Sequence, residues 1–177
     1  MSIDSLNASE IVNIADYLKQ PAENYVNDES VELQWALKAF HHAETYFNLI
    51  SAVDPMFLKL TRVDDVIYQT FREDFPDLDV RIVNDDELKS KEGKEKWREF
   101  CNKFEGKVED FNMGTLLRLD CGNDVSDENT TLVPRIQFLA IEIARNKEGL
   151  NGCLREKYGK KINKSEPNKN RNPESGS

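Results

Sequence analysis

Apolar residues recur at steps of three and four positions along most of this 177-residue chain. This spacing places side chains on one side of an α-helix. The pattern is longest between residues 29 and 53, where it predicts a long central helix that ends at Asp54-Pro55. Further helices are predicted over residues 8–18, 61–75, 84–111 and 134–149. A chain patterned in this way folds mainly as helices.

Two short segments follow the two-residue period of a β-strand instead. In the first, Leu78, Val80 and Ile82 alternate with charged residues, and the second covers residues 115–120. We expect the two segments to pair as a small ribbon. The predicted fold is therefore mainly α, a single-domain bundle of non-parallel helices with a small two-stranded β element.

The charge is distributed unevenly along the chain. Lys and Arg number 24 and Asp and Glu number 33, which gives a net charge of -9. Residues 156–177 hold six basic and three acidic residues, or +3, so residues 1–155 carry -12. Residues 156–177 are polar and contain few apolar residues. This composition predicts a folded domain over 1–155 and a disordered, net basic tail over 156–177. An acidic body repels DNA and suits a partner with a basic surface.

Sequence features also limit where the protein works. The longest apolar run, Phe138–Ile141, has four residues, whereas a membrane span needs about 20. The first residues lack the basic and apolar regions of a secretory signal. The three cysteines are odd in number and form no Cys-x-x-Cys pair, as is usual in a reducing compartment. We therefore expect a cytoplasmic protein that does not bind membranes and that can also enter the nucleus by diffusion.

Residues that carry catalytic or metal chemistry do not occur in the required patterns. His41 and His42 are adjacent on a predicted helix, so their side chains diverge by about 100° and cannot easily share one ion. Asp77 and Asp79 match the Asp-x-Asp element of some glycosyltransferases, but no nucleotide-binding succession of strands and helices precedes them. The eight glycines form no nucleotide-binding or hydrolase motif. We predict no metal, no cofactor and no catalytic residue.

A set of charged and polar residues lies inside otherwise apolar segments. Such residues either form ion pairs that lock the last helix to the strand or face a partner protein. Three acidic residues are our candidates for a partner contact, namely Glu109, Asp110 and Glu142. The other members of the set are Arg118, Arg135, Arg145 and Asn146.

Several strings of residues together resemble a single family. They are His42–Tyr46, Val53–Pro55, Leu58–Thr61, Asp64-Asp65, Ile67-Tyr68, Lys94–Arg98, Val108–Asn112, Gly114–Arg118, Pro134–Phe138 and Glu142–Asn146. Over about residues 21–151 the chain resembles the eukaryotic protein family named for containing a polysaccharide-biosynthesis domain.

The resemblance implies a small, mainly helical cytosolic protein that works by binding and not by catalysis. It implies a co-translational chaperone that binds the nascent GTPase domain of translation elongation factor 1-alpha at the ribosome, and we expect a monomer. Two alternatives stay open. One is a carbohydrate or methyl-donor transferase, for which the candidate residues are Asp77, Asp79 and Asp120. The other is a ribosome or RNA adaptor that uses the basic tail, residues 156–177.

Overall fold

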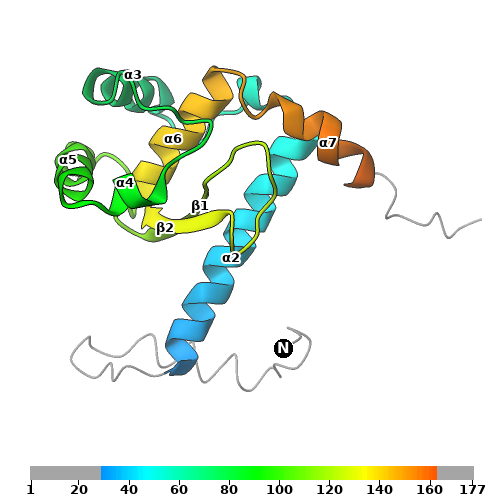
Figure 1. Ribbon diagram of the computed structural model, residues 1–177, viewed down its shortest axis with the longest axis horizontal. Helices are drawn as coiled ribbons and strands as arrows, with labels where there is room; N and C mark the ends of the chain where they lie inside the picture. Colours follow the sequence, from blue (N-terminus) through cyan, green and yellow to red (C-terminus); the bar gives the residue numbers. More distant parts are fainter. Residues whose placement is uncertain (1–28, 163–177) are drawn as a thin grey trace, which may run out of the picture. The chain divides into compact units, whose positions relative to one another are not determined.

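The computed structural model describes residues 29–162 (Figure 1). The chain divides inside its first described helix into two compact units, residues 1–41 and 42–177. The described part of the first unit, residues 29–41, is helical throughout, and all contacts reported below lie within the second unit. The elements are α2 (Glu29–Ala52), η3 (Pro55–Phe57), α3 (Asp64–Asp74), α4 (Asp85–Lys89), α5 (Lys91–Asn102), β1 (Gly114–Arg118), β2 (Thr130–Pro134), α6 (Arg135–Lys147) and α7 (Gly152–Ile162). The prediction of a mainly helical fold with a small two-stranded sheet is confirmed.

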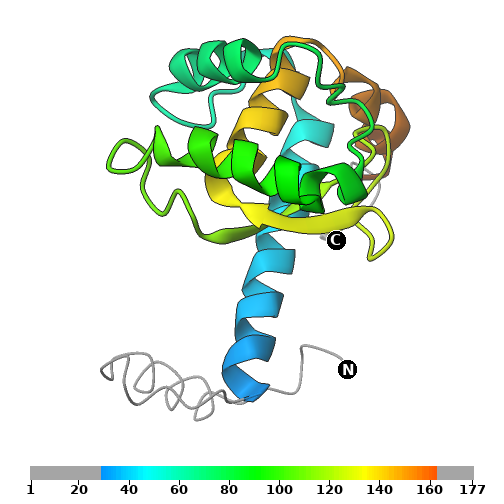
Figure 2. The same ribbon diagram turned by 60° about the vertical axis from the view of Figure 1, so that its left-hand side comes forward.

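The helix at the centre of the second unit is α6 and not α2. Every residue of α6 from Ile136 to Asn146 is buried, polar residues included. In Figures 1 and 2, α3 and α5 lie on one side of α6 and the C-terminal half of α2 on the other. Within residues 42–52 of α2, only Ala43, Ile50 and Ser51 are buried. The sequence pattern correctly predicted the length of α2 but wrongly made it the central helix.

Aromatic side chains form the core between α3 and α5. Phe71 of α3 and Phe75, which follows that helix, face Trp97 and Phe100 of α5. The Phe75 and Trp97 rings stack with their centroids 4.2 Å apart. All four side chains are buried. Each such aromatic pair contributes about 0.5–1.5 kcal/mol beyond the burial of its apolar area. This cluster holds α3, and the loop before it, against the rest of the unit.

The predicted helix over 84–111 is two helices followed by turns. Asn84 caps α4, because its Oδ1 accepts hydrogen bonds from the backbone N–H groups of Asp86 and Glu87. Ser90 ends α4 and caps α5, since its Oγ accepts from the N–H of Gly93 at 3.0 Å. Beyond α5 the chain turns, and Gly106 has a φ of 72°. An internal serine that can act as a cap offers the backbone an alternative to a continuous helix.

The predicted ribbon forms with a different second strand. β1 pairs antiparallel with β2, with Leu116 opposite Leu132. The segment predicted to pair, 78–83, is not a strand and keeps a single antiparallel bridge, Ile82 to Asp120. Its Val80 carbonyl accepts a 2.6 Å hydrogen bond from Nε of Arg145, a side-chain bond that replaces strand pairing there. The prediction over 115–120 is right for β1, and the one over 78–83 is wrong.

Helix α6 ends as predicted, and a further helix extends into the predicted tail. Gly149 has a φ of 76°, its N–H donates to Asn146 O, and the N–H of Leu150 donates to Arg145 O, which is a Schellman ending. The following helix α7 extends to Ile162, so residues 156–162 are helical although their composition predicted disorder. The rest of the tail and the predicted helix over 8–18 lie outside the described residues. Among the described helices, none has the length and apolar character needed to cross a membrane.

Candidate functional site

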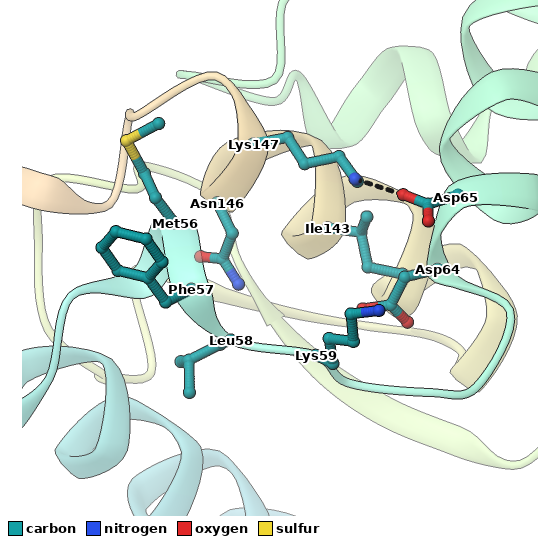
Figure 3. Close-up of a pocket in the computed structure, with 9 residues that line it drawn as sticks. All are labelled: Met56, Phe57, Leu58, Lys59, Asp64, Asp65, Ile143, Asn146 and Lys147. Atoms are coloured by element: carbon teal, nitrogen blue, oxygen red, sulfur yellow. Dashed lines mark hydrogen bonds and ion pairs between the residues drawn. The ribbon is translucent and has the colours of Figure 1, made fainter.

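A pocket of about 230 Å³ opens between η3, the start of α3 and the end of α6 (Figure 3). One side of it is apolar and comes from η3, whose Met56 and Phe57 are 58% and 85% exposed. The other side is charged and includes Lys59, Asp65 and Lys147. The remaining lining residues are Leu58, Asp64, Ile143 and Asn146. Large apolar side chains held in water beside a pocket are typical of a protein-binding site.

A short capped turn presents the two apolar side chains. Asp54 caps η3, because its Oδ1 accepts from the N–H of Met56 at 3.1 Å and its carbonyl accepts from the N–H of Phe57 at 3.2 Å. Pro55, the first residue of η3, is buried and suits that position because its missing N–H has no partner to lose. The turn therefore buries Pro55 while it leaves Met56 and Phe57 in solvent.

Asp64 fixes the loop at the edge of the pocket. Its carboxylate accepts hydrogen bonds from the N–H of Leu60 at 2.8 Å, the N–H of Thr61 at 2.6 Å and the hydroxyl of Thr61 at 2.7 Å. Asp64 itself is buried. The prediction that Thr61 and Asp64 cap a helix is wrong in its residues, because α3 begins at Asp64, its N-cap residue is Val63, and Val63 makes no side-chain cap bond. Three bonds to one carboxylate give this loop a defined position.

An exposed ion pair closes the charged side of the pocket. Nζ of Lys147 lies 2.6 Å from Oδ1 of Asp65, so the end of α6 is joined to the first turn of α3. The hydrogen bond from Lys147, followed by its charge, lowers the pKa of the Asp65 carboxyl. Exposed pairs of this kind contribute little to stability. The pair is accessible to a partner that carries charge of either sign.

A buried polar network lies behind the pocket and is linked to it through Asn146. The Asn146 side chain donates from Nδ2 to the Tyr46 hydroxyl at 3.1 Å and accepts at Oδ1 from Asn151 at 2.7 Å. Tyr46 and Asn151 both donate to Oε2 of Glu142, at 3.0 and 2.9 Å. Asn146 thus joins the pocket lining to a carboxylate in the centre of the unit.

Two arginines neutralise that carboxylate. Oε1 of Glu142 lies 2.7 Å from Nη1 of Arg145 and 3.3 Å from Nη2 of Arg118, and all three side chains are buried. Burial alone would raise the pKa of Glu142, but the charges of the two arginines and the hydrogen bonds from Arg145 and Asn151 hold it at about 2. The network is a support for the pocket and the ribbon, because its groups are paired with one another and not with solvent.

The comparisons with known proteins agree on one family. The family model described as PBDC1 protein matches residues 31–156. The chain belongs to the PBDC1 family. A human Protein PBDC1 is 56% identical over 147 residues, which cover 83% of this chain and 63% of the human one. The chain thus spans less than two thirds of that relative's length.

Fungal proteins are also similar to this chain, one of them in sequence and one in its solved structure. A Protein PBDC1 homolog of Saccharomyces cerevisiae is 47% identical over 75% of this chain and 94% of its own length. A solution NMR structure of a Saccharomyces cerevisiae protein matches with a TM-score of 0.70 and 45% identity, covering 77% of this chain and 97% of that one. The predicted family is confirmed.

The structure of this PBDC1 member separates the three acidic residues predicted to contact a partner. Glu109 and Asp110 are exposed, in the turns that follow α5. Glu142 is fully buried inside the network. A fully buried side chain cannot touch a partner while the domain is folded, so of the three residues only Glu109 and Asp110 are accessible to a partner.

The acidic residues considered for metal or transferase chemistry act in turns. Asp79 accepts from the N–H of Arg81 at 2.8 Å, and Asp120 accepts from the N–H of Gly122 and the amide of Asn123, both at 2.8 Å. Asp77, two positions before Asp79, is exposed. The described residues contain no group of three or more His, Cys, Asp or Glu side chains able to hold a metal ion. His42 belongs to no such group, and burial followed by the charge of Arg135 lowers its pKa.

Sequence reasoning missed the apolar side of the pocket. Met56 and Phe57 follow Asp54-Pro55, which was interpreted only as the end of a helix. Neither residue fits the apolar spacing of a neighbouring helix or strand. Two large apolar residues in a short connection, with no helix or strand face to join, were the sequence signal for an exposed apolar surface. The exposure of Phe57 is visible only in the structure, since burial depends on the elements that surround η3.

Proposed function

We propose that this PBDC1 member is a co-translational chaperone that binds the nascent GTPase domain of translation elongation factor 1-alpha. In this proposal it works in the cytoplasm as a monomer, by binding and without catalysis. Membership of the family supports the proposal, because the resemblance to that family implies this client. The observation that supports a client-binding site at η3 is the 85% exposure of Phe57, which lines a pocket.

The chemistry of an unfinished GTPase domain matches this surface. Such a domain exposes apolar sheet faces that associate with other apolar surface until they are buried. Its phosphate-binding loops are basic and lack their nucleotide. Met56 and Phe57 offer apolar surface to the exposed sheet faces. The net charge of -9 attracts the basic phosphate-binding loops. A chaperone that covers both prevents aggregation and leaves when the client fills its own core.

Removing the aromatic ring tests the contact. Tagged protein is captured from a translating extract, and the attached nascent chains are identified by mass spectrometry. Burying one phenylalanine ring contributes about 1.5–3 kcal/mol, so Phe57→Ser is expected to reduce recovery of elongation factor 1-alpha chains by about tenfold or more. Ile82→Ser is the matched control, because Ile82 is 62% exposed and does not line the pocket.

Glu109 and Asp110 are tested in the same capture by removing their charge. Asp110 has a φ of 51°, a conformation that asparagine tolerates, so Glu109→Gln with Asp110→Asn changes charge without straining the backbone. We expect weaker capture at low salt. Unchanged capture would remove these two residues from the contact while leaving the test of Phe57 intact.

The capture also separates the alternatives. Recovery of RNA in place of nascent elongation factor 1-alpha, with steep salt dependence, would support the ribosome or RNA adaptor. Binding of a sugar nucleotide or methyl donor, lost on substitution of Asp77, Asp79 or Asp120, would support a transferase. Either result would overturn the chaperone proposal.

A further inference from the structure

A second groove, of about 480 Å³, lies beside the loop that precedes α3. Residues 60–63 form one side of it, residues 107–109 of the turns after α5 form another, and Arg135 at the start of α6 completes it. Its lining includes neither Met56 nor Phe57. The groove is therefore a different site from the pocket of Figure 3.

Three cations line this groove on an otherwise acidic protein. They are Arg62, Lys107 and Arg135, against one acid, Glu109. Within the described part of the chain, the side chains of the three cations take part in no hydrogen bond or ion pair. By contrast, Arg72, Arg118 and Arg145 are each paired with a glutamate. Because these three cations form no ion pair or hydrogen bond within the described unit, such contacts do not explain their position in the groove.

Arg135 is the least exposed of the three. Its backbone N–H donates to Met113 O at 2.7 Å, which fixes its position at the first turn of α6. Its Nε is buried without a hydrogen-bond partner. A buried donor is normally paired in a folded protein, so a missing partner calls for an explanation such as an absent ligand. A planar guanidinium is suited to bidentate recognition of an anion.

The rest of the lining is apolar and limits the kind of anion. Leu60 and Val63 are half-buried and Val108 is buried, so apolar surface lies next to the cations. A bare phosphate makes no use of apolar surface, and a long nucleic acid is repelled by the net charge of -9. A peptide that carries a carboxylate next to an apolar side chain can contact both the cations and the apolar surface of the groove.

We propose that this groove binds a short acidic peptide segment of a partner protein, with an Asp or Glu carboxylate on Arg135 and Lys107 and an adjacent apolar side chain against Leu60 and Val63. The groove would bind an acidic partner, whereas the acidic body as a whole attracts a basic one. The inference does not rest on the chaperone function, since it uses no residue assigned to the client contact except Glu109, which borders the groove.

The test uses the full chain labelled with ¹⁵N and titrated with a capped peptide, acetyl-Leu-Glu-Asp-Leu-amide. The expected result is saturable shifts in the amide signals of residues 60–63 and 107–109. The matched peptide acetyl-Leu-Gln-Asn-Leu-amide is expected to leave those signals in place. Inorganic phosphate, titrated separately, is expected to bind there more weakly than the acidic peptide.

Variants decide whether the named cations are responsible. Arg135→Gln is expected to weaken peptide binding by about tenfold or more, the loss that corresponds to one charge-assisted contact. Lys107→Gln, at an exposed position, is the second variant in case Arg135→Gln alters the fold. The control is Arg98→Gln, which removes an exposed cation of α5 that does not line the groove.

Three results would overturn the proposal. The first is no saturable binding of the acidic peptide. The second is equal binding of the uncharged peptide or of phosphate at the same signals. The third is unchanged affinity in Lys107→Gln and in a folded Arg135→Gln.

Discussion

Glu142 shows how one residue can join several elements of this fold. Its carboxylate receives bonds from Tyr46 of α2, Arg118 of β1 and Asn151 of the turn before α7. A carboxylate taken out of water is costly unless all of its oxygen atoms are paired. Here both oxygens are paired, so the charge is retained and each neighbouring element is held at a fixed distance from α6.

We predict that Glu142→Gln strongly destabilises the protein at neutral pH. The substitution leaves two buried arginines with less than their compensating charge, a change that typically costs about 3–5 kcal/mol. The free energy of unfolding, measured by urea denaturation at pH 7, is expected to fall by about that amount. Asp65→Asn, which removes an exposed carboxylate of an ion pair, is the matched control and is expected to leave stability nearly unchanged.

The same carboxylate predicts an acid dependence of stability. Its pKa is about 2 in the folded protein against an ordinary value of 4.5. A depressed folded pKa stabilises the protein above the ordinary pKa, and this contribution is lost as pH falls from about 4.5 toward 2. The pKa difference corresponds to about 3 kcal/mol.

Urea denaturation of the wild type and of Glu142→Gln across pH 2 to 7 measures this contribution. The difference in unfolding free energy between the two proteins is expected to shrink on acidification. A difference that stays constant down to pH 2 would contradict the assignment of the ionised carboxylate to Glu142.

Part of this network could be predicted from single residues. Arg118, Glu142, Arg145 and Asn146 stand in apolar segments, and ion pairing between the strand and the last helix was one of the two interpretations. The contacts of Arg118 with Glu142 confirm it. The contribution of Tyr46 could not be predicted, because it lies about a hundred positions from its partners and carries no charge.

At the scale of elements, the helices were easier to predict than the strands. Helices α3 and α6 show a clear apolar stripe and local start or stop residues, and these signals depend on near neighbours in sequence. The pairing of β1 with β2 depends on a distant segment, and β2 has no clear alternation of its own. Residues 78–83 do alternate, yet Ile82 is exposed and Arg145 takes the Val80 carbonyl.

The junction between α4 and α5 predicts an unusual effect of Gly93. Replacing glycine by alanine inside a helix ordinarily stabilises it, by about 1 kcal/mol. A Cβ at Gly93 would overlap the carbonyl oxygen of Glu87, a backbone atom that cannot move without disturbing the Ser90 cap. We therefore expect Gly93→Ala to destabilise the protein by about 1–3 kcal/mol in urea denaturation.

Gly152→Ala serves as the control for this substitution. Gly152 begins α7, and a Cβ there meets no atom within 4 Å. We expect this variant to be neutral or slightly stabilising, by up to about 1 kcal/mol. Equal effects of the two substitutions would show that the close approach to Glu87 does not control the junction.

At the scale of the whole molecule, charge and packing divide the chain at different places. Net charge changes sign near residue 156, which is why composition placed the end of the folded domain there. Packing continues further, since Tyr158 lies edge-on to Phe47 with ring centroids 5.1 Å apart. Nζ of Lys157 also donates to Gly122 O and to Oδ1 of Asn123, both at 3.0 Å. A lysine can count toward a basic tail and still hold a loop of the folded unit.

Two truncations distinguish the charge boundary from the packing boundary. A chain ending at residue 155 loses Lys157 and Tyr158, whereas a chain ending at 162 keeps both and the whole of α7. Loss of the aromatic pair and its buried area costs about 2 kcal/mol, so we expect the shorter chain to melt about 4–8 °C lower than the longer one. Tyr158→Ala in the longer chain should reproduce most of that difference in differential scanning calorimetry. If the two truncated chains melt together, α7 beyond residue 155 contributes nothing to the fold, and the boundary at 155 predicted from composition is the physical one.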